Sequence, residues 1–178
     1  MQQELVKFLE RYASKKSVFN NKKMFSSSYK PTSIPHRDDL IKQVGVILAP
    51  ILKMEKPSNL FVYGKTGSGK TLSINGEIRS AFDSMAASKN IPIKTIYLNC
   101  KLKGVADTEY RLIAQLAREF GKTIPATGLP TEEVYKLFFK AVDESESAVI
   151  LILDEIDELT KKTGSEILYN FKRVNEEL

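Results

Sequence analysis

Apolar residues recur at the three- and four-residue spacing of an amphipathic helix in five separate stretches of the chain. These stretches cover residues 2–13, 37–51, 112–120, 131–142 and 165–177. Local signals mark some of their ends. Pro50 is expected to distort or end the second helix, Gly121 to stop the third and Thr131 to cap the fourth.

Three shorter runs are predicted to be strands, at residues 60–63, 93–98 and 148–153. The last run is apolar throughout, as expected of a strand that is covered on both faces. Another helix is predicted to follow the glycine-rich run after the first strand and to reach about Ala87. The pair Asn75-Gly76 is locally unfavourable for it. Strands that alternate with helices imply an α/β fold, a parallel sheet with flanking helices and right-handed crossovers.

The length of 178 residues suits one domain with a sizeable core. The longest aliphatic run, residues 148–153, is far too short to cross a bilayer, and no signal-peptide pattern opens the chain. The single cysteine, Cys100, excludes an internal disulfide and suits a reducing compartment. These features predict a cytoplasmic protein without membrane contact.

The net charge of +5 is concentrated near the beginning of the chain. Residues 1–30 carry 7 basic and 2 acidic side chains, whereas the remaining residues carry 20 of each kind. Such a basic arm either contacts a phosphate backbone or is a solvated leader. Residues 14–34 are rich in Lys, Ser and Asn and read as a linker. We therefore expect a basic helix and linker at 1–34 and one folded domain at 35–178.

The glycine-rich run carries the most specific chemical signal. It reads Gly64-Lys65-Thr66-Gly67-Ser68-Gly69-Lys70-Thr71 and fits G-x-x-x-x-G-K-[ST] at each fixed position. Its glycines allow backbone N–H groups to point at phosphate oxygens, beside the positive end of the following helix. Lys70 would reach the β- and γ-phosphates, and the Thr71 hydroxyl would bind Mg²⁺. The alternative is an ordinary glycine-rich turn between a strand and a helix.

A second motif favours the phosphate loop over that alternative. The strand at 148–153 ends in Asp154 and Glu155. Asp154 is expected to hold the Mg²⁺ water shell opposite Thr71, and Glu155 to polarise a water for attack on the γ-phosphate. The interval from Lys70 to Asp154 is 84 residues, which leaves room for one inserted strand and its helices. The two motifs together predict a P-loop ATPase site.

Asn99 follows the second strand and should lie at the same edge of the sheet. It either hydrogen-bonds Glu155 and holds it away from the water until a partner binds, or it satisfies a turn. The only histidine, His36, lies in Ile34-Pro35-His36-Arg37 and lacks further His or Cys ligands, so a lip over the adenine is favoured over a metal site. Cys100 is expected in the core or a turn. Asp157 and Glu158 are expected in a solvated acidic turn.

Several short motifs also occur together in a characteristic order. Besides the two motifs above, they are Tyr29-Lys30-Pro31, Ile34-Pro35-His36-Arg37, Tyr97-Leu98-Asn99-Cys100, Thr127-Gly128-Leu129-Pro130, Leu153-Asp154-Glu155-Ile156-Asp157, Leu168-Tyr169-Asn170 and Arg173-Val174-Asn175. The series resembles the AAA+ replication initiators of the archaeal origin-recognition and cell-division-control family. The resemblance covers roughly residues 25–178.

The resemblance implies an ATP- or ADP-bound, Mg²⁺-dependent switch, associated with the nucleoid. It would bind double-stranded origin DNA, self-associate there and help to load the replicative helicase. By position, Lys70 and Thr71 match the family's phosphate and metal contacts, and Asp154 and Glu155 its metal and water residues. Asn99 matches its switch position, and residues 34–37 its nucleotide-edge segment. Residues 101–131 resemble a region that includes a helical insertion touching DNA.

The family continues with a sensor strand, an arginine finger, a helical lid and a winged-helix domain, which this sequence does not contain. The resemblance therefore implies a fold that is truncated before the sensor strand and lid. The alternative is that the strands at 60–63 and 148–153 pair directly. Hydrolysis is expected in the longer protein, and this chain alone is expected to be inactive or weak, since an arginine finger contributes about 10³–10⁵ in rate. Two other functions remain open: a non-hydrolysing ATP-binding assembly module and a P-loop nucleotide kinase.

Overall fold

The computed structural model describes residues 2–14, 19, 21–26, 29, 34–104, 106–125 and 127–177. Its internal contacts divide the chain into two units, residues 1–32 and 33–178. The basic residues Lys15, Lys16 and Lys30, and Pro31 of the first motif, lie outside the described residues. No helix among the described residues is long and apolar enough to span a membrane.

The first unit contains α1, Gln2–Ser14, and a short 3-10 helix, η1, Lys22–Phe25. The predicted helix at 2–13 is therefore confirmed. One face of α1 exposes large apolar side chains, with Phe8 and Tyr12 stacked at 6.5 Å between ring centroids. The Asn21 side chain begins η1 by accepting a hydrogen bond of 3.1 Å from the backbone N–H of Lys23. A short helix thus lies within the segment predicted as a linker.

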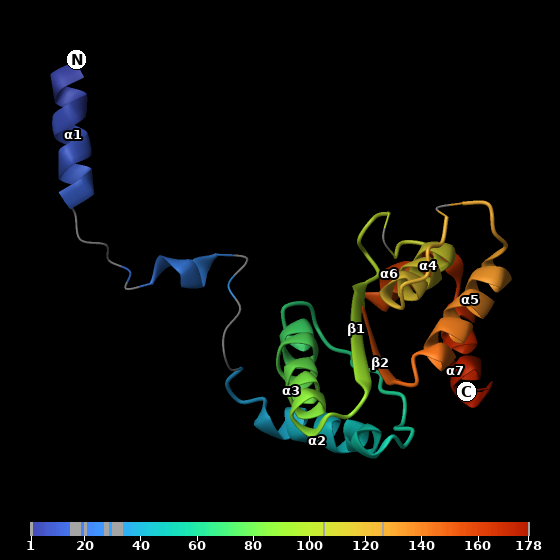
Figure 1. Ribbon diagram of the computed structural model, residues 1–178. Helices are drawn as coiled ribbons and strands as arrows, with labels where there is room; N and C mark the ends of the chain where they lie inside the picture. Colours follow the sequence, from blue (N-terminus) through green and yellow to red (C-terminus); the bar gives the residue numbers. More distant parts are fainter. Residues whose placement is uncertain are drawn as a thin grey trace. The chain divides into compact units, whose positions relative to one another are not determined.

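The second unit is built on a parallel pair of strands, β1, Ile93–Asn99, and β2, Ala148–Asp154. Helices lie on both sides of this pair (Figure 1). One side carries α2, Asp38–Leu48, the 3-10 helix η2, Ala49–Lys53, the π-helix η3, Leu72–Ile78, and α3, Arg79–Lys89. The other side carries α4, Glu109–Glu119, α5, Thr131–Glu144, α6, Ile156–Thr163, and α7, Glu166–Glu177. The predicted parallel α/β architecture is confirmed.

The register of the two strands decides which residues share a face. Ile96 pairs with Leu151 and Leu98 with Leu153, and these residues belong to a core with α4 and α5. Ile93 pairs with Ala148, on the opposite face, which packs against α2, η3 and α3. Because side chains alternate along a strand, Tyr97, Asn99 and Asp154 share this second face. The register therefore directs polar side chains toward the helix that follows the glycine-rich loop.

The predicted strand at 60–63 is wrong. Residues 60–63 carry no strand hydrogen bonds, and their side chains are exposed, from 36% for Val62 to 83% for Tyr63. In the described part of the chain, β2 pairs only with β1, so direct pairing of 60–63 with 148–153 is also wrong. A strand needs a hydrogen-bonded neighbour, and local apolar character does not supply one. The unpaired second edge also explains why every residue of β2 stays partly exposed although helices cover both faces.

Two further predictions need correction. Thr131 does not cap α5, because Pro130 takes the extended cap conformation and its carbonyl accepts from the N–H groups of Glu133 and Val134. Asp157 and Glu158 were expected in a solvated acidic turn; their side chains are solvent-accessible, but they lie in the first turn of α6, and both carboxylates pair with Lys161. Carboxylates there favour the helix dipole, and the pairs have the spacing of helical neighbours.

The remaining boundaries follow the sequence closely. The helix containing Pro50 changes from α to 3-10 form at Ala49. Gly121 follows the end of α4 with a φ of 78°, which glycine adopts without steric cost. Cys100 is completely buried, and burial, then the nearby Asp154 charge, raises the pKa of its thiol to about 11. It is a core residue, as expected.

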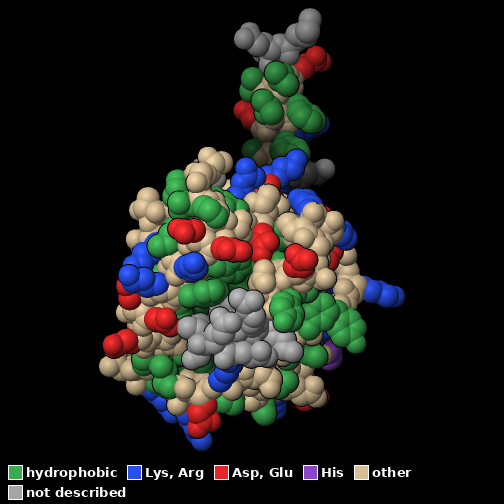
Figure 2. Space-filling view, turned by 90° about the vertical axis from the view of Figure 1, so that its right-hand side faces the viewer, with side chains coloured by type: hydrophobic (Ala, Val, Ile, Leu, Met, Phe, Trp, Pro, Cys, Tyr) green, Lys and Arg blue, Asp and Glu red, His purple; other side chains and the backbone are tan. Residues whose placement is uncertain are grey.

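Charged side chains of both signs and scattered hydrophobic ones share the visible face in Figure 2.

We expect Leu112→Ala to destabilise the protein by about 3 kcal/mol, because Leu112 is fully buried in the α4 core. Denaturant unfolding of the two proteins would measure the loss. Leu168→Ala is the matched control, since Leu168 on α7 is 43% exposed. Its expected loss is below about 1 kcal/mol. Equal losses at the two positions would contradict the assignment of the core.

Candidate nucleotide-binding site

The loop at 64–71 is closed around the side chain of Lys70. Its ammonium donates hydrogen bonds to the carbonyl oxygens of Gly64, at 2.9 Å, and Lys65, at 3.0 Å. Gly67 and Gly69 have φ values of 77° and 84°, which only glycine adopts readily. These two glycines therefore allow the loop to fold back over the lysine.

A helix begins where the loop ends, as predicted. Thr71 has helical φ and ψ, and the Ser73 N–H donates to the carbonyl of Gly69 at 2.9 Å. The first seven-residue stretch, η3, is a π-helix and α3 continues from it. The pair Asn75-Gly76, which disfavours an α-helix, lies inside η3. The helix start therefore lies directly behind the loop.

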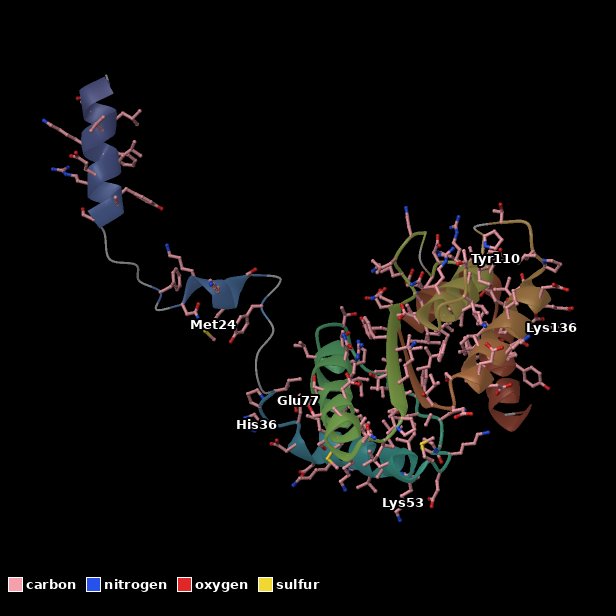
Figure 3. The ribbon with its side chains drawn as sticks, in the orientation of Figure 1. Met24, His36, Lys53, Glu77, Tyr110 and Lys136 are labelled. Atoms are coloured by element: carbon pink, nitrogen blue, oxygen red, sulfur yellow. The ribbon has the colours of Figure 1, made fainter. Side chains whose placement is uncertain are left out.

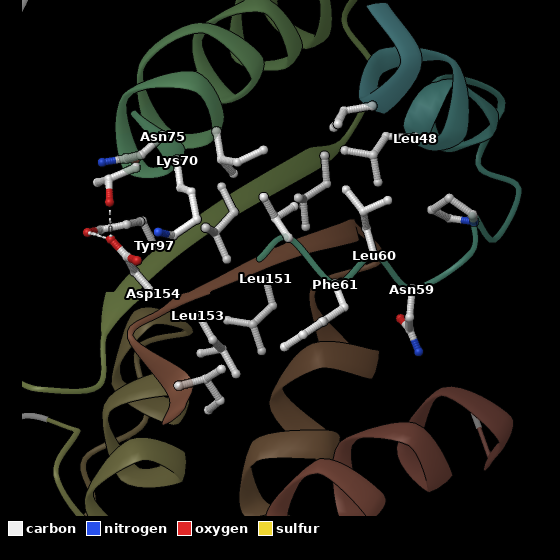
Figure 4. Close-up of a pocket in the computed structure, with 18 of the residues that line it drawn as sticks. Leu48, Asn59, Leu60, Phe61, Lys70, Asn75, Tyr97, Leu151, Leu153 and Asp154 are labelled. Atoms are coloured by element: carbon white, nitrogen blue, oxygen red, sulfur yellow. Dashed lines mark hydrogen bonds between the residues drawn. The ribbon is translucent and has the colours of Figure 1, made fainter. Parts of the chain in front are cut away.

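Asp154 joins this loop to the end of β2. Its Oδ2 atom accepts a hydrogen bond from the Thr71 hydroxyl at 2.8 Å and another from the Tyr97 hydroxyl at 2.8 Å (Figure 4). Its Oδ1 atom accepts from the backbone N–H of Glu155 at 3.0 Å. Burial, then the hydrogen bond to Asp154, raises the pKa of Tyr97 to about 12. Tyr97 is therefore a protonated donor to this carboxylate across the physiological range.

Asn99 lies at the expected edge of the sheet, opposite Asp154 in the register. Its side-chain oxygen accepts from the N–H of Lys101 at 2.9 Å, so the alternative in which Asn99 satisfies a turn matches the structure. The partner of Glu155 is Lys101, whose ammonium lies 3.4 Å from Glu155 Oε2 in an exposed ion pair. Glu155 has left-handed backbone angles, φ 52° and ψ 38°, which are unusual for a residue with a side chain.

The segment 34–37 is attached to the loop and to η3, within the second unit. The Ile34 N–H donates to Glu77 Oε1 at 2.9 Å, and the Arg37 guanidinium donates to the Ser68 carbonyl. Figure 3 shows that the segments carrying Glu77 and His36 lie side by side in space. His36 is exposed and has a φ of 61°. The described residues contain no group of three His, Cys, Asp or Glu side chains suited to a metal. The structure thus brings the segment to the loop.

A cavity of about 330 Å³ extends from the end of the loop along β2. Lys70, Thr71, Tyr97 and Asp154 line its polar end, and Leu60, Phe61, Leu151 and Leu153 belong to its apolar part (Figure 4). The apolar part separates the unpaired segment at 60–62 from the open edge of β2. The polar part gathers the residues of both sequence motifs in one place.

The residues at the polar end fit a magnesium nucleotide. Mg²⁺ prefers oxygen ligands and is commonly bound by one or two protein oxygens together with substrate phosphates. A hydrogen bond of 2.8 Å joins the Thr71 hydroxyl to the Asp154 carboxylate. Lys70, the residue before Thr71, carries an ammonium group. The hydroxyl and carboxylate oxygens suit a hard cation. The ammonium and the start of the helix suit phosphate oxygens.

Comparison with known proteins defines the class first. A family model described as "AAA domain" matches residues 53–177, and the chain belongs to that family. Among the members of that family, the chain is similar to ORC1-type DNA replication proteins of archaea. It is 41% identical to the ORC1-type DNA replication protein of Pyrococcus abyssi over 99% of this chain and 42% of that protein. It is 42% identical to ORC1-type DNA replication protein 1 of Methanosarcina mazei over 99% of this chain and 41% of that protein.

Solved structures agree with this assignment. The Aeropyrum pernix ORC1 protein, solved in complex with DNA, superposes with a TM-score of 0.78 at 34% identity over 89% of this chain and 41% of that chain. The Aeropyrum pernix ORC2 protein, solved as ADPNP–ADP complexes, has a TM-score of 0.67 at 22% identity over 91% of this chain and 42% of that chain. The ORC2 likeness concerns the fold. The chain spans about two fifths of the length of the relatives it matches.

Three residues that contribute to this arrangement were not assigned a role at the site from the sequence: Tyr97, Lys101 and Glu77. Tyr97 could have been found, because it lies two residues before Asn99 and so on the same face of β1. Lys101 and Glu77 act from a turn and a π-helix, on partners 54 and 43 residues away. No local pattern encodes such pairings.

Proposed function

We propose that this chain binds ATP or ADP with Mg²⁺ and forms the nucleotide-binding part of a DNA replication initiator. The observation that carries the proposal is the hydrogen bond between Thr71 of the loop and Asp154 of β2. It joins the two motifs that a P-loop ATPase needs at the same point, next to Lys70. The ORC1-type relatives support replication as the process.

Each residue then has a role set by its position. Lys70 exchanges its loop carbonyls for phosphate oxygens, Thr71 and Asp154 hold Mg²⁺, and Glu155 orients a water for attack. Bound Mg²⁺ would neutralise developing charge on the phosphates. Asn99 shapes the turn that carries Lys101, and residues 34–37 form one wall beside the nucleotide. Glu155 would orient this water in competition with Lys101, which pairs with its Oε2 atom.

In the longer protein, we propose ATP hydrolysis, binding to double-stranded origin DNA, self-association on that DNA and help in loading the replicative helicase. The support for DNA binding is the similarity to an ORC1 protein that was solved with DNA. The basic residues of 1–30 would add phosphate contacts, so affinity for duplex DNA should fall steeply with salt. Salt-independent binding would contradict that contribution.

A second candidate for this chain alone is ATP binding without hydrolysis, favoured by the pairing of Glu155 with Lys101. The test is ATP binding with and without Mg²⁺, together with ATP turnover, for this chain and for a longer parent. Mg²⁺-dependent binding by the chain and turnover by the parent are expected. Absence of binding by both would overturn the proposed function. ATP turnover by this chain, without any further part of the parent, would overturn the non-hydrolysing candidate.

A further inference from the structure

Tyr97 lines the polar end of the cavity and belongs to neither nucleotide motif. It lies on β1, pairs with Ile152 in the register and is only partly exposed. Side chains alternate along a strand, so Tyr97 lies on the same face of the sheet as Asn99 and Asp154. This is the face that carries η3. From this position, its hydroxyl reaches the Asp154 carboxylate at 2.8 Å.

Every hydrogen bond made by the Asp154 carboxylate restricts its rotation. The Oδ2 atom accepts from Thr71 and Tyr97, and the Oδ1 atom accepts from the N–H of Glu155. The N–H contact is local and fixes one oxygen. The Thr71 hydroxyl is itself a proposed metal ligand, so its own orientation changes when a cation binds. Tyr97 is therefore the donor that can hold the second oxygen in place both before and after the cation arrives.

We infer that Tyr97 is a positioning residue, whose hydroxyl orients Asp154 for the Mg²⁺ that accompanies the nucleotide. The inference rests on the proposed function, since it concerns the same site. Groups that hydrogen-bond metal-binding side chains typically contribute about 10–100-fold to metal affinity. Because Tyr97 acts through Asp154, its contribution is expected in the Mg²⁺-dependent part of binding.

The experiment compares ATP affinity in Mg²⁺ and in EDTA for the unchanged chain and for Tyr97→Phe. Phenylalanine keeps the ring and removes only the hydroxyl. We expect affinity in EDTA to stay the same and the gain in affinity from Mg²⁺ to fall about tenfold. Titration of Mg²⁺ or Mn²⁺ at saturating nucleotide should show the same loss of metal affinity. This second readout does not depend on hydrolysis.

Tyr135→Phe is the matched control. The Tyr135 hydroxyl donates to Glu109 Oε1 at 2.8 Å, which is the same kind of bond between α5 and α4. Its removal should leave both affinities unchanged, and thermal unfolding should report similar stability for the two variants. A loss of metal affinity confined to Tyr97→Phe would support the positioning role.

Three results would overturn the inference. If the unchanged chain gains affinity from Mg²⁺ and Tyr97→Phe gains as much, the inference alone fails. An equal loss in Mg²⁺ and in EDTA for Tyr97→Phe would assign the residue a structural role. If the unchanged chain binds ATP in neither condition, the proposed function fails and the inference fails with it.

Discussion

Lys70→Ala should weaken ATP binding about a thousandfold. The Lys70 ammonium makes two hydrogen bonds within the loop, to the carbonyls of Gly64 and Lys65. In the proposed complex it donates to phosphate oxygens, and hydrogen bonds to charged groups contribute roughly 1.5–3 kcal/mol each. Two such bonds correspond to a few orders of magnitude in affinity, since each 1.4 kcal/mol is about tenfold. Calorimetric titration with ATP and Mg²⁺ measures the change.

The control for Lys70→Ala is Lys136→Ala. Lys136 is exposed on α5 (Figure 3), so the same charge is removed outside the loop. We expect its ATP affinity to match that of the unchanged chain within about twofold. If the two variants lose the same affinity, the effect is one of net charge, and the loop has no special part in binding. If neither loses affinity, ATP does not bind at this loop.

Glu155→Gln should lower ATP turnover of the longer parent at least about a hundredfold and leave ATP affinity nearly unchanged. A positioned general base contributes about 10²–10⁴ in rate, and glutamine keeps the shape without the basic oxygen. The variant also loses the ion pair with Lys101, in which the side chains are 66% and 41% exposed. An exposed pair contributes at most about 1 kcal/mol, so folding should not change much. Steady-state phosphate release and nucleotide binding separate the two effects.

Glu158→Gln is the control for Glu155→Gln. Glu158 lies in the first turn of α6, the helix that begins directly after Glu155, and its carboxylate pairs with Lys161 at 2.8 Å. The variant removes one negative charge close to the site without altering the residue that follows Asp154. Its turnover should stay within about twofold of the parent. Unchanged turnover in Glu155→Gln would remove Glu155 from the role proposed for it.

Much of the fold follows from local patterns. The periods of apolar residues predict α1, α2, α4, α5 and α7, and the composition of two runs predicts β1 and β2. These elements agree because a helix or a half-buried strand must repeat its apolar positions with its own period. α6 was missed because it has only eight residues, and its acidic first turn resembles a loop. The strand at 60–63 was wrongly predicted because its apolar residues satisfy the composition of a strand without providing a neighbour.

The candidate site divides in the same way. The residues of the phosphate loop and the pair Asp154 and Glu155 are recognisable from sequence, because both motifs are short and have fixed spacing. Their meeting point follows from the parallel sheet, in which strand ends share one edge. The partner of Glu155 was not predictable. Asn99 was one of two alternatives, as a contact of Glu155 or as a turn residue, and in the structure it satisfies a turn while Lys101 pairs with the Glu155 carboxylate.

The sequence by itself determined the order of the longer helices and of β1 and β2, the glycine positions of the loop and the identity of the charged groups at the site. These depend on residues that are near one another along the chain. Only the tertiary structure decided that Tyr97 and Thr71 share one oxygen of Asp154, that Glu77 holds Ile34, and that residues 60–63 remain unpaired. The physical reason is that hydrogen bonds between distant segments depend on register, strand order and side-chain reach. Local periodicity does not record these properties.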